Sequence, residues 1–302
     1  MTRPPVVVLG PTASGKSDVA MAAAVSRGGV HIVACDSMQV YRRMDIGTAK
    51  PSAADRALVP HHGLDICEPG ERCTVSLYAD HVRQARLRIG ECGAAEIVVG
   101  GTGLYLTAVT DGLNLPGEWL DIRAALEDDP DTGAMFARLR VLDPVAAGRM
   151  EPGNRRRIIR ALEVCLGSGM PFSSFGDGVA VHPDNGTVMI GIRWDREVLR
   201  ERIAVRVRRM VDEGLVEEVR SLLAEPAGLS PTAAQALGYK EMIAHVQGHV
   251  SLDDAVAEIV LRTGQFAVRQ ERWFRRDPRI KWVDVRRDPV EEVTPHVLAA
   301  LP

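Results

Sequence analysis

The sequence Val6-Val7-Val8-Leu9-Gly10-Pro11-Thr12-Ala13-Ser14-Gly15-Lys16-Ser17 decides the fold of this chain. Four apolar residues predict a buried β-strand, and the pattern G-x-x-x-x-G-K-S that follows them is a P-loop. In a P-loop, glycines let backbone N–H groups converge on an anion that lies at the positive N-terminus of the next helix. We therefore expect residues 10–17 to bind a phosphate compound, with Lys16 on its terminal oxygens and the Ser17 hydroxyl on Mg²⁺. A glycine-rich turn without a ligand is the alternative, and it does not account for the complete spacing.

The composition is ordinary for a soluble globular protein, with 302 residues, 46% hydrophobic and 25% charged. This length suits one large domain or two smaller ones. No apolar run approaches the roughly 20 residues that a membrane-spanning helix needs. The strand predicted from Val6 leaves no room for a signal peptide, so we expect a cytoplasmic protein. The five cysteines are odd in number and lack C-x-x-C spacing, so neither a disulfide framework nor a zinc site is predicted.

Two segments are basic although the formal net charge is −3. Residues 193–210 carry seven arginines against three acidic residues, and residues 262–281 carry six arginines and one lysine against two acidic residues. Such segments suggest a polyanionic partner, and solvated helix faces are the alternative. In the second segment a helical row of arginines can follow a phosphate backbone. Its members are Arg262, Arg269, Arg272 and Arg276.

Polar residues follow two other predicted strands. Asp36 comes directly after the strand expected at residues 31–35, and Thr102 lies in the glycine-rich turn that follows residues 96–99. Because the carboxyl ends of parallel strands line the ligand crevice of an α/β sheet, we expect Asp36 to lie beside the P-loop. The alternative for Asp36 is a helix N-cap for the segment after it. Thr102 is the polar group that the glycine-rich turn offers.

The alternation of strands and helices stops in the middle of the chain. We predict a core from residues 1–112, a helical insertion at residues 113–186 and the rest of the core at residues 187–302. A short extended piece is expected at residues 64–66 and an edge strand at residues 280–283. The predicted fold class is α/β, a P-loop NTPase-like core with a parallel sheet flanked by helices, plus the helical insertion domain.

Six motifs spread over nearly the whole chain resemble those of the tRNA dimethylallyltransferase family. They are G-P-T-A-S-G-K-S at 10–17, D-S-M-Q-V-Y-R at 36–42, G-T-A-K-P at 47–51, G-G-T-G-L-Y at 100–105, R-I-I-R-A-L-E-V at 157–164 and G-Y-K-E at 238–241. The P-loop is shared with many NTPases, but its combination with the motifs at 36–42 and 100–105 is not. Val268 and Arg272 depart from the family pattern, which has lysine and threonine there, and Arg43 replaces a common glycine.

This resemblance implies transfer of a dimethylallyl group from dimethylallyl diphosphate to N6 of the adenosine 3′ of the anticodon, in tRNAs that read codons beginning with U. The P-loop, Lys16 and Mg²⁺ would stabilise the departing diphosphate, and Asp36 would act as the general base on the amine. Thr102 would orient the reacting groups, and Arg206 is a candidate for a further diphosphate contact. The insertion would grip the anticodon stem-loop. The tRNA contacts expected are Asp36, Ser37, Met38, Gln39, Thr102, Arg123, Arg156, Arg157, Ile158, Ile159 and Arg160.

Two other classes of function remain open at this point. A P-loop kinase of a nucleotide or small metabolite would use the same loop on ATP and Asp36 on an acceptor hydroxyl, and it predicts an arginine-bearing lid. A tRNA-binding P-loop protein without catalysis would use Asp36 only to cap a helix. We expect no obligate protein partner, no membrane association and a monomer.

Overall fold

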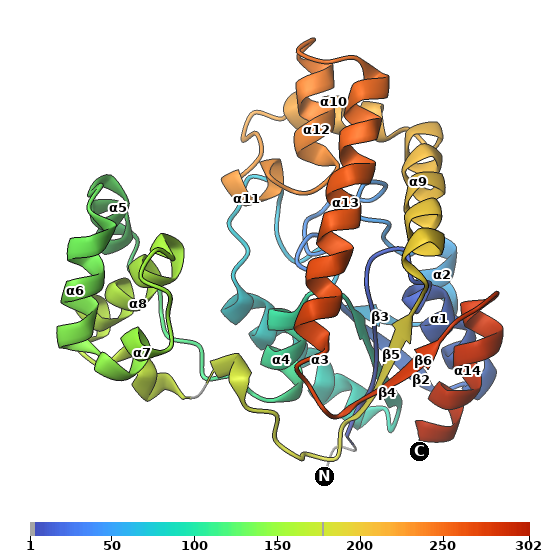
Figure 1. Ribbon diagram of the computed structural model, residues 1–302. Coiled ribbons are helices and arrows are strands. Elements are labelled where there is room, and N and C mark those ends of the chain that lie inside the picture. The colour runs from blue at the N-terminus through green and yellow to red at the C-terminus, as the bar shows by residue number, and fades with distance from the viewer. Residues whose placement is uncertain (1–3, 177) are drawn as a thin grey trace. The chain divides into compact units, whose positions relative to one another are not determined.

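The computed structural model describes residues 4–176 and 178–302, and it divides the chain into two compact units (Figure 1). The α/β unit comprises Met1–Asp111 and His182–Pro302, and the helical unit comprises Gly112–Val181. Residues 182–186 thus belong to the α/β unit and not to the insertion in which we expected them. Hydrogen bonds explain the difference: Arg279 donates to the Pro183 carbonyl over 2.7 Å and Asn185 to the Thr110 carbonyl over 2.8 Å.

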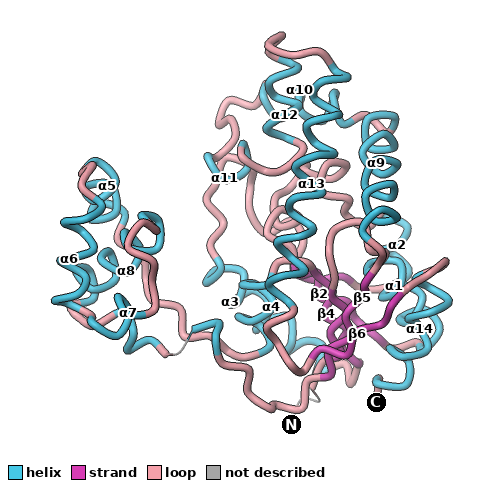
Figure 2. The backbone as a smooth tube through the Cα atoms, viewed as in Figure 1, coloured by secondary structure: helices cyan, strands magenta, loops and turns pink. Residues whose placement is uncertain are grey.

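A six-stranded sheet forms the centre of the α/β unit, and all its neighbouring strands run parallel (Figure 2). The strand order is β3-β2-β4-β1-β5-β6. The strands are β1 (Val6–Leu9), β2 (Val30–Cys35), β3 (His61–His62), β4 (Ala95–Gly100), β5 (Val188–Arg193) and β6 (Ile280–Asp284). All four residues of β1 are buried, as expected for a central strand of a parallel sheet that is covered on both faces. The predicted α/β fold class is confirmed, and so is the edge strand near the C-terminus.

The register of the sheet brings three strand ends together. Leu9 lies opposite Gly100 of β4 and Gly191 of β5, and Gly100 also lies opposite Cys35 of β2. From β1 the chain builds β2, β3 and β4 on one side and β5 and β6 on the other, so the sheet reverses its winding at β1. Ligands of open α/β sheets bind at such switch points, and the P-loop follows β1 there.

Helices cover both faces of the sheet (Figures 1 and 2). Helices α1 (Lys16–Arg27) and α14 (Pro289–Ala300) pack together on one face, and α3 (Val75–Glu91) and α4 (Gly103–Thr110) pack on the other. The remaining helices of this unit are α2 (Ala53–Leu58), α9 (Arg196–Asp212), α10 (Leu215–Leu223), α11 (Pro231–Ala234), α12 (Tyr239–Val246) and α13 (Leu252–Phe274). In Figure 1, α9, α10, α12 and α13 rise beyond the carboxyl ends of the strands, where they pack against one another.

One short strand differs from the prediction. Residues 64–66 are not extended, and the strand is instead β3, which pairs with Ile32 and Val33 of β2. The physical reason lies in Asp65, whose φ of 53° is left-handed and turns the chain. Its carboxylate pairs with Lys50 over 2.8 Å and with Arg56 over 2.5 Å, which stabilises the turn.

The helical unit has a small apolar core of its own. Its helices are α5 (Leu120–Asp128), α6 (Thr132–Leu142), α7 (Pro144–Gly148) and α8 (Arg155–Ser168). Leu139, Ile158 and Leu162 are fully buried in this core. Helix α5 lacks the usual start signal in the sequence, because its N-cap residue Trp119 offers no side-chain capping bond. Within the described part of this unit there is no strand, as expected. Across the described residues of the whole chain, none of the helices combines the length and apolar character that crossing a bilayer requires.

Candidate active site

The P-loop forms part of the wall of a cleft of about 1200 Å³ in the α/β unit. Gly15 precedes α1 with a φ of +89°, and a Cβ there would lie 2.5 Å from Pro289. Both the conformation and the packing therefore require glycine at this position. Ser14 is fully buried, and its backbone carbonyl accepts a hydrogen bond from the indole of Trp194 over 3.0 Å. The loop is thus held in shape by the rest of the unit before any anion binds.

Lys16 lies in this cleft together with Asp36. Loss of hydration on burial lowers the pKa of Lys16 to about 8, and the positive charge of Arg206 acts in the same direction. The negative charges of Asp36 and Asp18 oppose the shift. Because burial disfavours the charged ammonium of Lys16 and a nearby anion favours it, Lys16 is suited to bind a polyanion.

Two arginines of α9 form hydrogen bonds with the P-loop. Arg206 Nη1 donates to the Thr12 hydroxyl over 3.3 Å, and burial lowers the pKa of this guanidinium. Arg202 Nε donates to the Ala13 carbonyl over 2.9 Å, and its guanidinium lies 4.4 Å from the centre of the Trp194 ring. Arg206 was predicted, whereas Arg202 was missed as a site residue. Its spacing of four residues from Arg206 on one helix face was the available signal.

Asp36 follows β2 and lines the cleft, and its carboxylate also accepts hydrogen bonds from the backbone just after it. Its Oδ1 accepts hydrogen bonds from the Met38 N–H over 2.8 Å and from the Gln39 N–H over 3.4 Å. These two bonds close a turn at residues 37–40, and no helix begins there, so the helix N-cap alternative is wrong. Both bonds use Oδ1, so among the described residues Oδ2 is left for a substrate. Thr102 is placed differently, because its hydroxyl accepts from the Ser37 N–H over 3.3 Å and so fixes the backbone that follows Asp36.

Gln39 lines the same cleft and is oriented by the loop at residues 45–50. Its amide Nε2 donates to the carbonyls of Thr48 and Ala49 over 3.0 and 3.1 Å. Because the amide nitrogen is directed at these two acceptors, the carbonyl oxygen of Gln39 points the other way and is left for a substrate donor. Two carbonyls of the motif at residues 47–51 therefore fix the orientation of the Gln39 side chain in the motif at residues 36–42.

Glu218 of α10 anchors that loop. Its carboxylate accepts the N–H groups of Asp45, Ile46 and Gly47 over 2.9, 2.7 and 3.2 Å, and the Tyr239 hydroxyl over 2.6 Å. A Cβ at Gly47 would lie 2.5 Å from the Tyr239 ring, which explains the glycine. Glu218 was missed by sequence reasoning, since nothing local marks a glutamate that acts about 170 residues away in the chain.

The oxygen donors in the cleft suit Mg²⁺. The exposed Ser17 hydroxyl and the Asp36 carboxylate both line the cleft, and Mg²⁺ prefers hard oxygen ligands that it shares with phosphates and water. No cluster of three or more His, Cys, Asp or Glu residues among the described residues is arranged to hold a metal by itself. The residues therefore fit a Mg²⁺ that arrives with a bound diphosphate.

Comparison with known proteins decides the family. A family model described as IPP transferase matches residues 39–277. The tRNA dimethylallyltransferase of Geobacter metallireducens is 46% identical over 285 residues, which cover 92% of either chain. The tRNA dimethylallyltransferase of Streptomyces coelicolor is 46% identical over 284 residues, which cover 92% of this chain and 89% of that one. The chain belongs to the IPP transferase family.

Solved structures agree with this assignment. The tRNA isopentenylpyrophosphate transferase of Bacillus halodurans superimposes with a TM-score of 0.70 at 36% identity, covering 99% of this chain and 96% of that one. A eukaryotic dimethylallyltransferase acting on tRNA gives a TM-score of 0.82 at 23% identity, with 98% of this chain and 78% of that chain covered, and it shows that the fold is shared. The family resemblance read from the motifs is thus confirmed.

In this IPP transferase the predicted tRNA contacts of α8 divide by exposure. Arg156 and Arg157 are exposed and remain candidates for an RNA contact. Ile158 and Ile159 are buried in the core of the helical unit, because the apolar side of α8 is needed for packing. Their side chains therefore offer no surface to an RNA, and an RNA contact at these two positions stays a prediction.

Arg123 and Arg160 of the helical unit are engaged with Glu163, which is 0% exposed. Arg123 lies 2.6 Å from Glu163 Oε2, and Arg160 lies 2.9 Å from Oε1. Burial opposes ionisation of Glu163, but hydrogen bonds from the Trp119 N–H and the two arginines outweigh it and hold its pKa below the usual range. In this IPP transferase these arginines therefore stabilise the helical unit, whatever else they contact.

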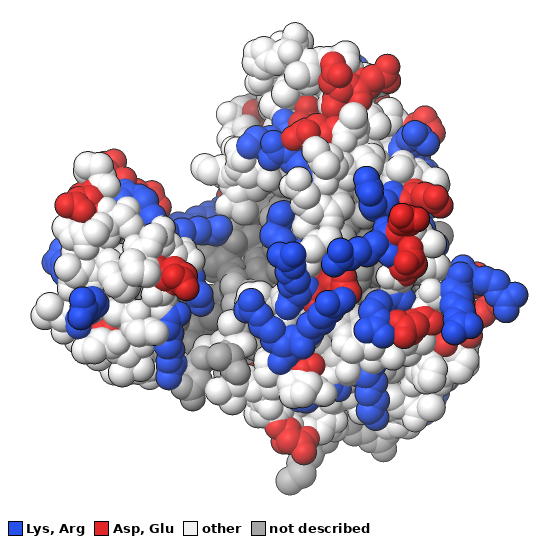
Figure 3. All heavy atoms as spheres, in the orientation of Figure 1, with Lys and Arg blue, Asp and Glu red and all other residues white. Residues whose placement is uncertain are grey.

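Lys and Arg side chains gather over the face of the α/β unit that α13 crosses (Figure 3). Arg269, Arg272 and Arg276 are exposed there, so three members of the predicted row are accessible. Arg262 is exposed as well, and it pairs with Glu258 over 2.5 Å and lies 3.5 Å from Glu241. Because such surface ion pairs are weak, contact of the whole row with a phosphate backbone stays a prediction.

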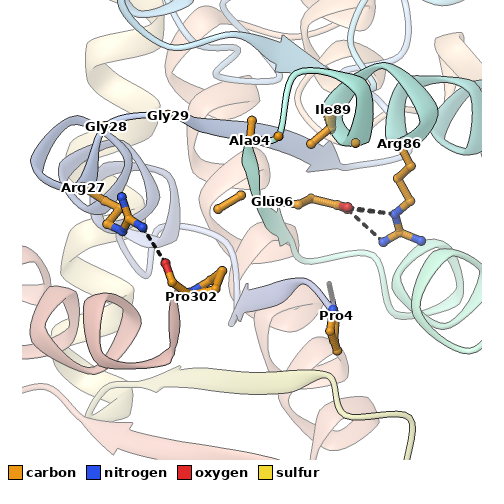
Figure 4. Close-up of a pocket in the computed structure, with 12 residues that line it drawn as sticks. Pro4, Arg27, Gly28, Gly29, Arg86, Ile89, Ala94, Glu96 and Pro302 are labelled. Atoms are coloured by element: carbon orange, nitrogen blue, oxygen red, sulfur yellow. Dashed lines mark hydrogen bonds and ion pairs between the residues drawn. The ribbon is translucent and has the colours of Figure 1, made fainter. Parts of the chain in front are cut away.

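A second hollow of about 390 Å³ lies at the opposite end of β1, β2 and β4 (Figure 4). Arg86 there pairs with Glu96 over 2.9 Å, and Arg27 donates to the Pro302 carbonyl over 2.6 Å. These charged groups satisfy one another. The chemistry of this IPP transferase is therefore expected at the carboxyl ends of the strands.

Proposed function

We propose that this chain transfers a dimethylallyl group from dimethylallyl diphosphate to the N6 amine of the adenosine 3′ of the anticodon, with release of diphosphate. The relatives named tRNA dimethylallyltransferase support prenyl transfer to tRNA. The observation that carries the proposal is the single cleft that holds the P-loop cations together with the Asp36 carboxylate. A kinase would use the same loop, but no relative described above is named as one.

The P-loop side of the cleft supports departure of a diphosphate. An allylic diphosphate ionises readily when the negative charge of its leaving group is neutralised. Lys16 and the α9 arginines, Arg202 and Arg206, place three cationic side chains at the loop. Mg²⁺, held with help from Ser17 when bound, supplies further neutralisation of that charge. Backbone N–H groups at the start of α1, from Gly15 to Ser17, complete the cradle.

The Asp36 side of the cleft supports attack by an aromatic amine. Such an amine is a poor nucleophile and must lose a proton as the new C–N bond forms, so a carboxylate within hydrogen-bond reach is required. Asp36 Oδ2 takes this proton, while the bonds from the Met38 and Gln39 N–H groups hold the carboxylate through Oδ1. Thr102 acts through the backbone of Ser37 and keeps Asp36 in place.

The acceptor is the anticodon stem-loop of tRNAs that read codons beginning with U. Its target base leaves the stack to reach the cleft, which costs a few kcal/mol. Ser37, Met38 and Gln39 lie along the extruded nucleotide, and exposed arginines of α8 and α13 offset the cost through phosphate contacts. We propose that the helical unit grips the stem-loop, and that the enzyme works as a cytoplasmic monomer without an obligate protein partner.

The test supplies the enzyme with Mg²⁺, unmodified tRNA and either labelled dimethylallyl diphosphate or labelled ATP. We expect label to move from the prenyl donor to tRNA and not from ATP. Asp36→Asn keeps the acceptor oxygen for the Met38 N–H but cannot take a proton, so it is expected to bind tRNA normally and to lose turnover by about 100-fold or more. Transfer from ATP alone, or undiminished turnover in Asp36→Asn, contradicts the proposal.

A further inference from the structure

Gln270 of α13 is a buried glutamine whose amide joins two loops of the active cleft. It is 6% exposed and lines the cleft beside the P-loop. Its Oε1 accepts the Thr12 N–H over 2.9 Å, and its Nε2 donates to the Gly101 carbonyl over 2.8 Å. The Thr12 N–H is thus directed at Gln270 and not at an anion. One amide therefore sets the separation between the phosphate cradle and the glycine-rich turn that carries Thr102.

The close approach of α13 explains two glycines of that turn. A Cβ at Gly101 would lie 2.4 Å from Gln270 Nε2, and a Cβ at Gly103 would lie 2.0 Å from Trp273 Nε1. Gln270 and Trp273 are three residues apart, so they share one face of the helix. The backbone at Gly101 and at Gly103, on either side of Thr102, therefore packs closely against one face of α13.

We infer that Gln270 is a positioning residue for the transfer reaction, acting by fixing the distance between the P-loop and the segment that holds Asp36. The link is continuous: Gln270 binds Thr12 and Gly101, Thr102 binds the Ser37 N–H, and Ser37 follows Asp36. Small errors in the placement of reacting groups slow a reaction by as much as about 100-fold. The inference rests on the proposed function, because the two groups it spaces are the leaving-group cradle and the general base.

The decisive variants are Gln270→Glu and Gln270→Met. Glutamate keeps the acceptor for the Thr12 N–H but, when ionised, sets a carboxylate oxygen against the Gly101 carbonyl. When protonated, it regains a donor for that carbonyl and restores both bonds. Methionine matches the length of the side chain and can make neither bond. Gln84, an exposed glutamine of α3, provides the controls Gln84→Glu and Gln84→Met.

The measurement is the single-turnover rate of dimethylallyl transfer to tRNA, taken as the ratio of variant to wild type at each pH from about 8.5 to about 6, where a buried carboxyl titrates. Lys16, Asp36 and Arg206 share the cleft with Gln270 in the wild type and in the variants alike, so the ratio removes the pH dependence that these groups give to both enzymes. We expect the single-turnover rate of Gln270→Met to be about 10-fold to 100-fold below that of the wild type at every pH. We expect the ratio for Gln270→Glu to rise as pH falls, by at most about tenfold per pH unit.

Flat ratios near one for both variants overturn the inference, as does a Gln270→Glu ratio that does not change with pH. Both control variants are expected to match the wild type throughout. If Gln270→Met does not fold, the pH profile of Gln270→Glu decides alone. A wild-type enzyme that fails to prenylate tRNA contradicts the proposed function, whereas an active wild type with insensitive Gln270 variants contradicts only this inference.

Discussion

Arg206 of α9 and Thr12 of the P-loop are joined by a 3.3 Å hydrogen bond from a guanidinium to a hydroxyl. The two residues are 194 positions apart in the chain, so the phosphate cradle is completed by the second half of the α/β unit. In the proposed reaction, negative charge grows on the leaving diphosphate as its bond to the prenyl carbon breaks. A cation in this position therefore stabilises the transition state more than the ground state.

Arg206→Leu is therefore expected to lower kcat/KM for dimethylallyl diphosphate by about 100-fold, with much of the loss in kcat. Arg208→Leu removes an exposed arginine from the same helix and is the matched control. Steady-state kinetics with tRNA held saturating measures both values. A rise in KM with unchanged kcat contradicts a role in stabilising the leaving group.

Gly103→Ala is expected to lower the free energy of unfolding by about 1–3 kcal/mol, because the added Cβ overlaps the Trp273 indole. Trp273→Leu in the same chain makes room and is expected to remove part of the added loss. Gly264→Ala on α13 is the control, since a Cβ there meets nothing within 4 Å and alanine favours the helix. Urea unfolding measures the free energy of unfolding of the wild type, Gly103→Ala, the double variant with Trp273→Leu, and Gly264→Ala. Equal losses from the two glycine substitutions would show that the Trp273 contact is not the cause.

Glu218→Gln is expected to raise KM for tRNA, because the amide keeps one acceptor oxygen but places an NH2 group against donors that the other oxygen accepts in the loop that orients Gln39. The lost acceptor also predicts a destabilisation of about 1–3 kcal/mol. The neighbouring Glu217→Gln, whose side chain is 69% exposed, is the control. The measurements are tRNA-dependent kinetics and thermal unfolding. An unchanged KM for tRNA in a folded Glu218→Gln enzyme contradicts the role of the loop.

The helical unit is expected to lose stability in acid through Glu163. Its pKa is lowered in the folded state, so the carboxylate contributes stability above its ordinary pKa, and this contribution is lost as pH falls through the lowered value. Glu163→Gln removes the charge at every pH and leaves Arg123 and Arg160 without their shared partner. We expect the difference in unfolding free energy between wild type and Glu163→Gln to shrink as pH falls below about 4. A difference that is constant with pH would rule out ionisation of Glu163 as the source of its effect.

The parts of the site that could be predicted are those encoded by short segments. The strand, the P-loop and the helix after it are encoded by consecutive residues. The position of Asp36 beside the P-loop follows from the rule that the carboxyl ends of parallel strands share one edge of the sheet. Glu218 and Gln270 could not be found this way, because each bonds to backbone groups far away in the chain and neither lies in a pattern with its own chemistry. Ile158 and Ile159 lie in a family motif, and the role of their side chains that the structure shows is packing in the core of the helical unit.

Arg279 holds the two points at which the chain leaves and re-enters the α/β unit. Its guanidinium donates to Asp111 Oδ1 over 2.8 Å and to the Pro183 carbonyl over 2.7 Å, so one side chain spans exit and return. The stretch between them is therefore attached to the α/β unit at one place, and we expect the sheet to tolerate a longer or shorter version of it. If this stretch grips the stem-loop as proposed, exchanging it is a way for selectivity among RNA substrates to diverge while the cleft stays unchanged.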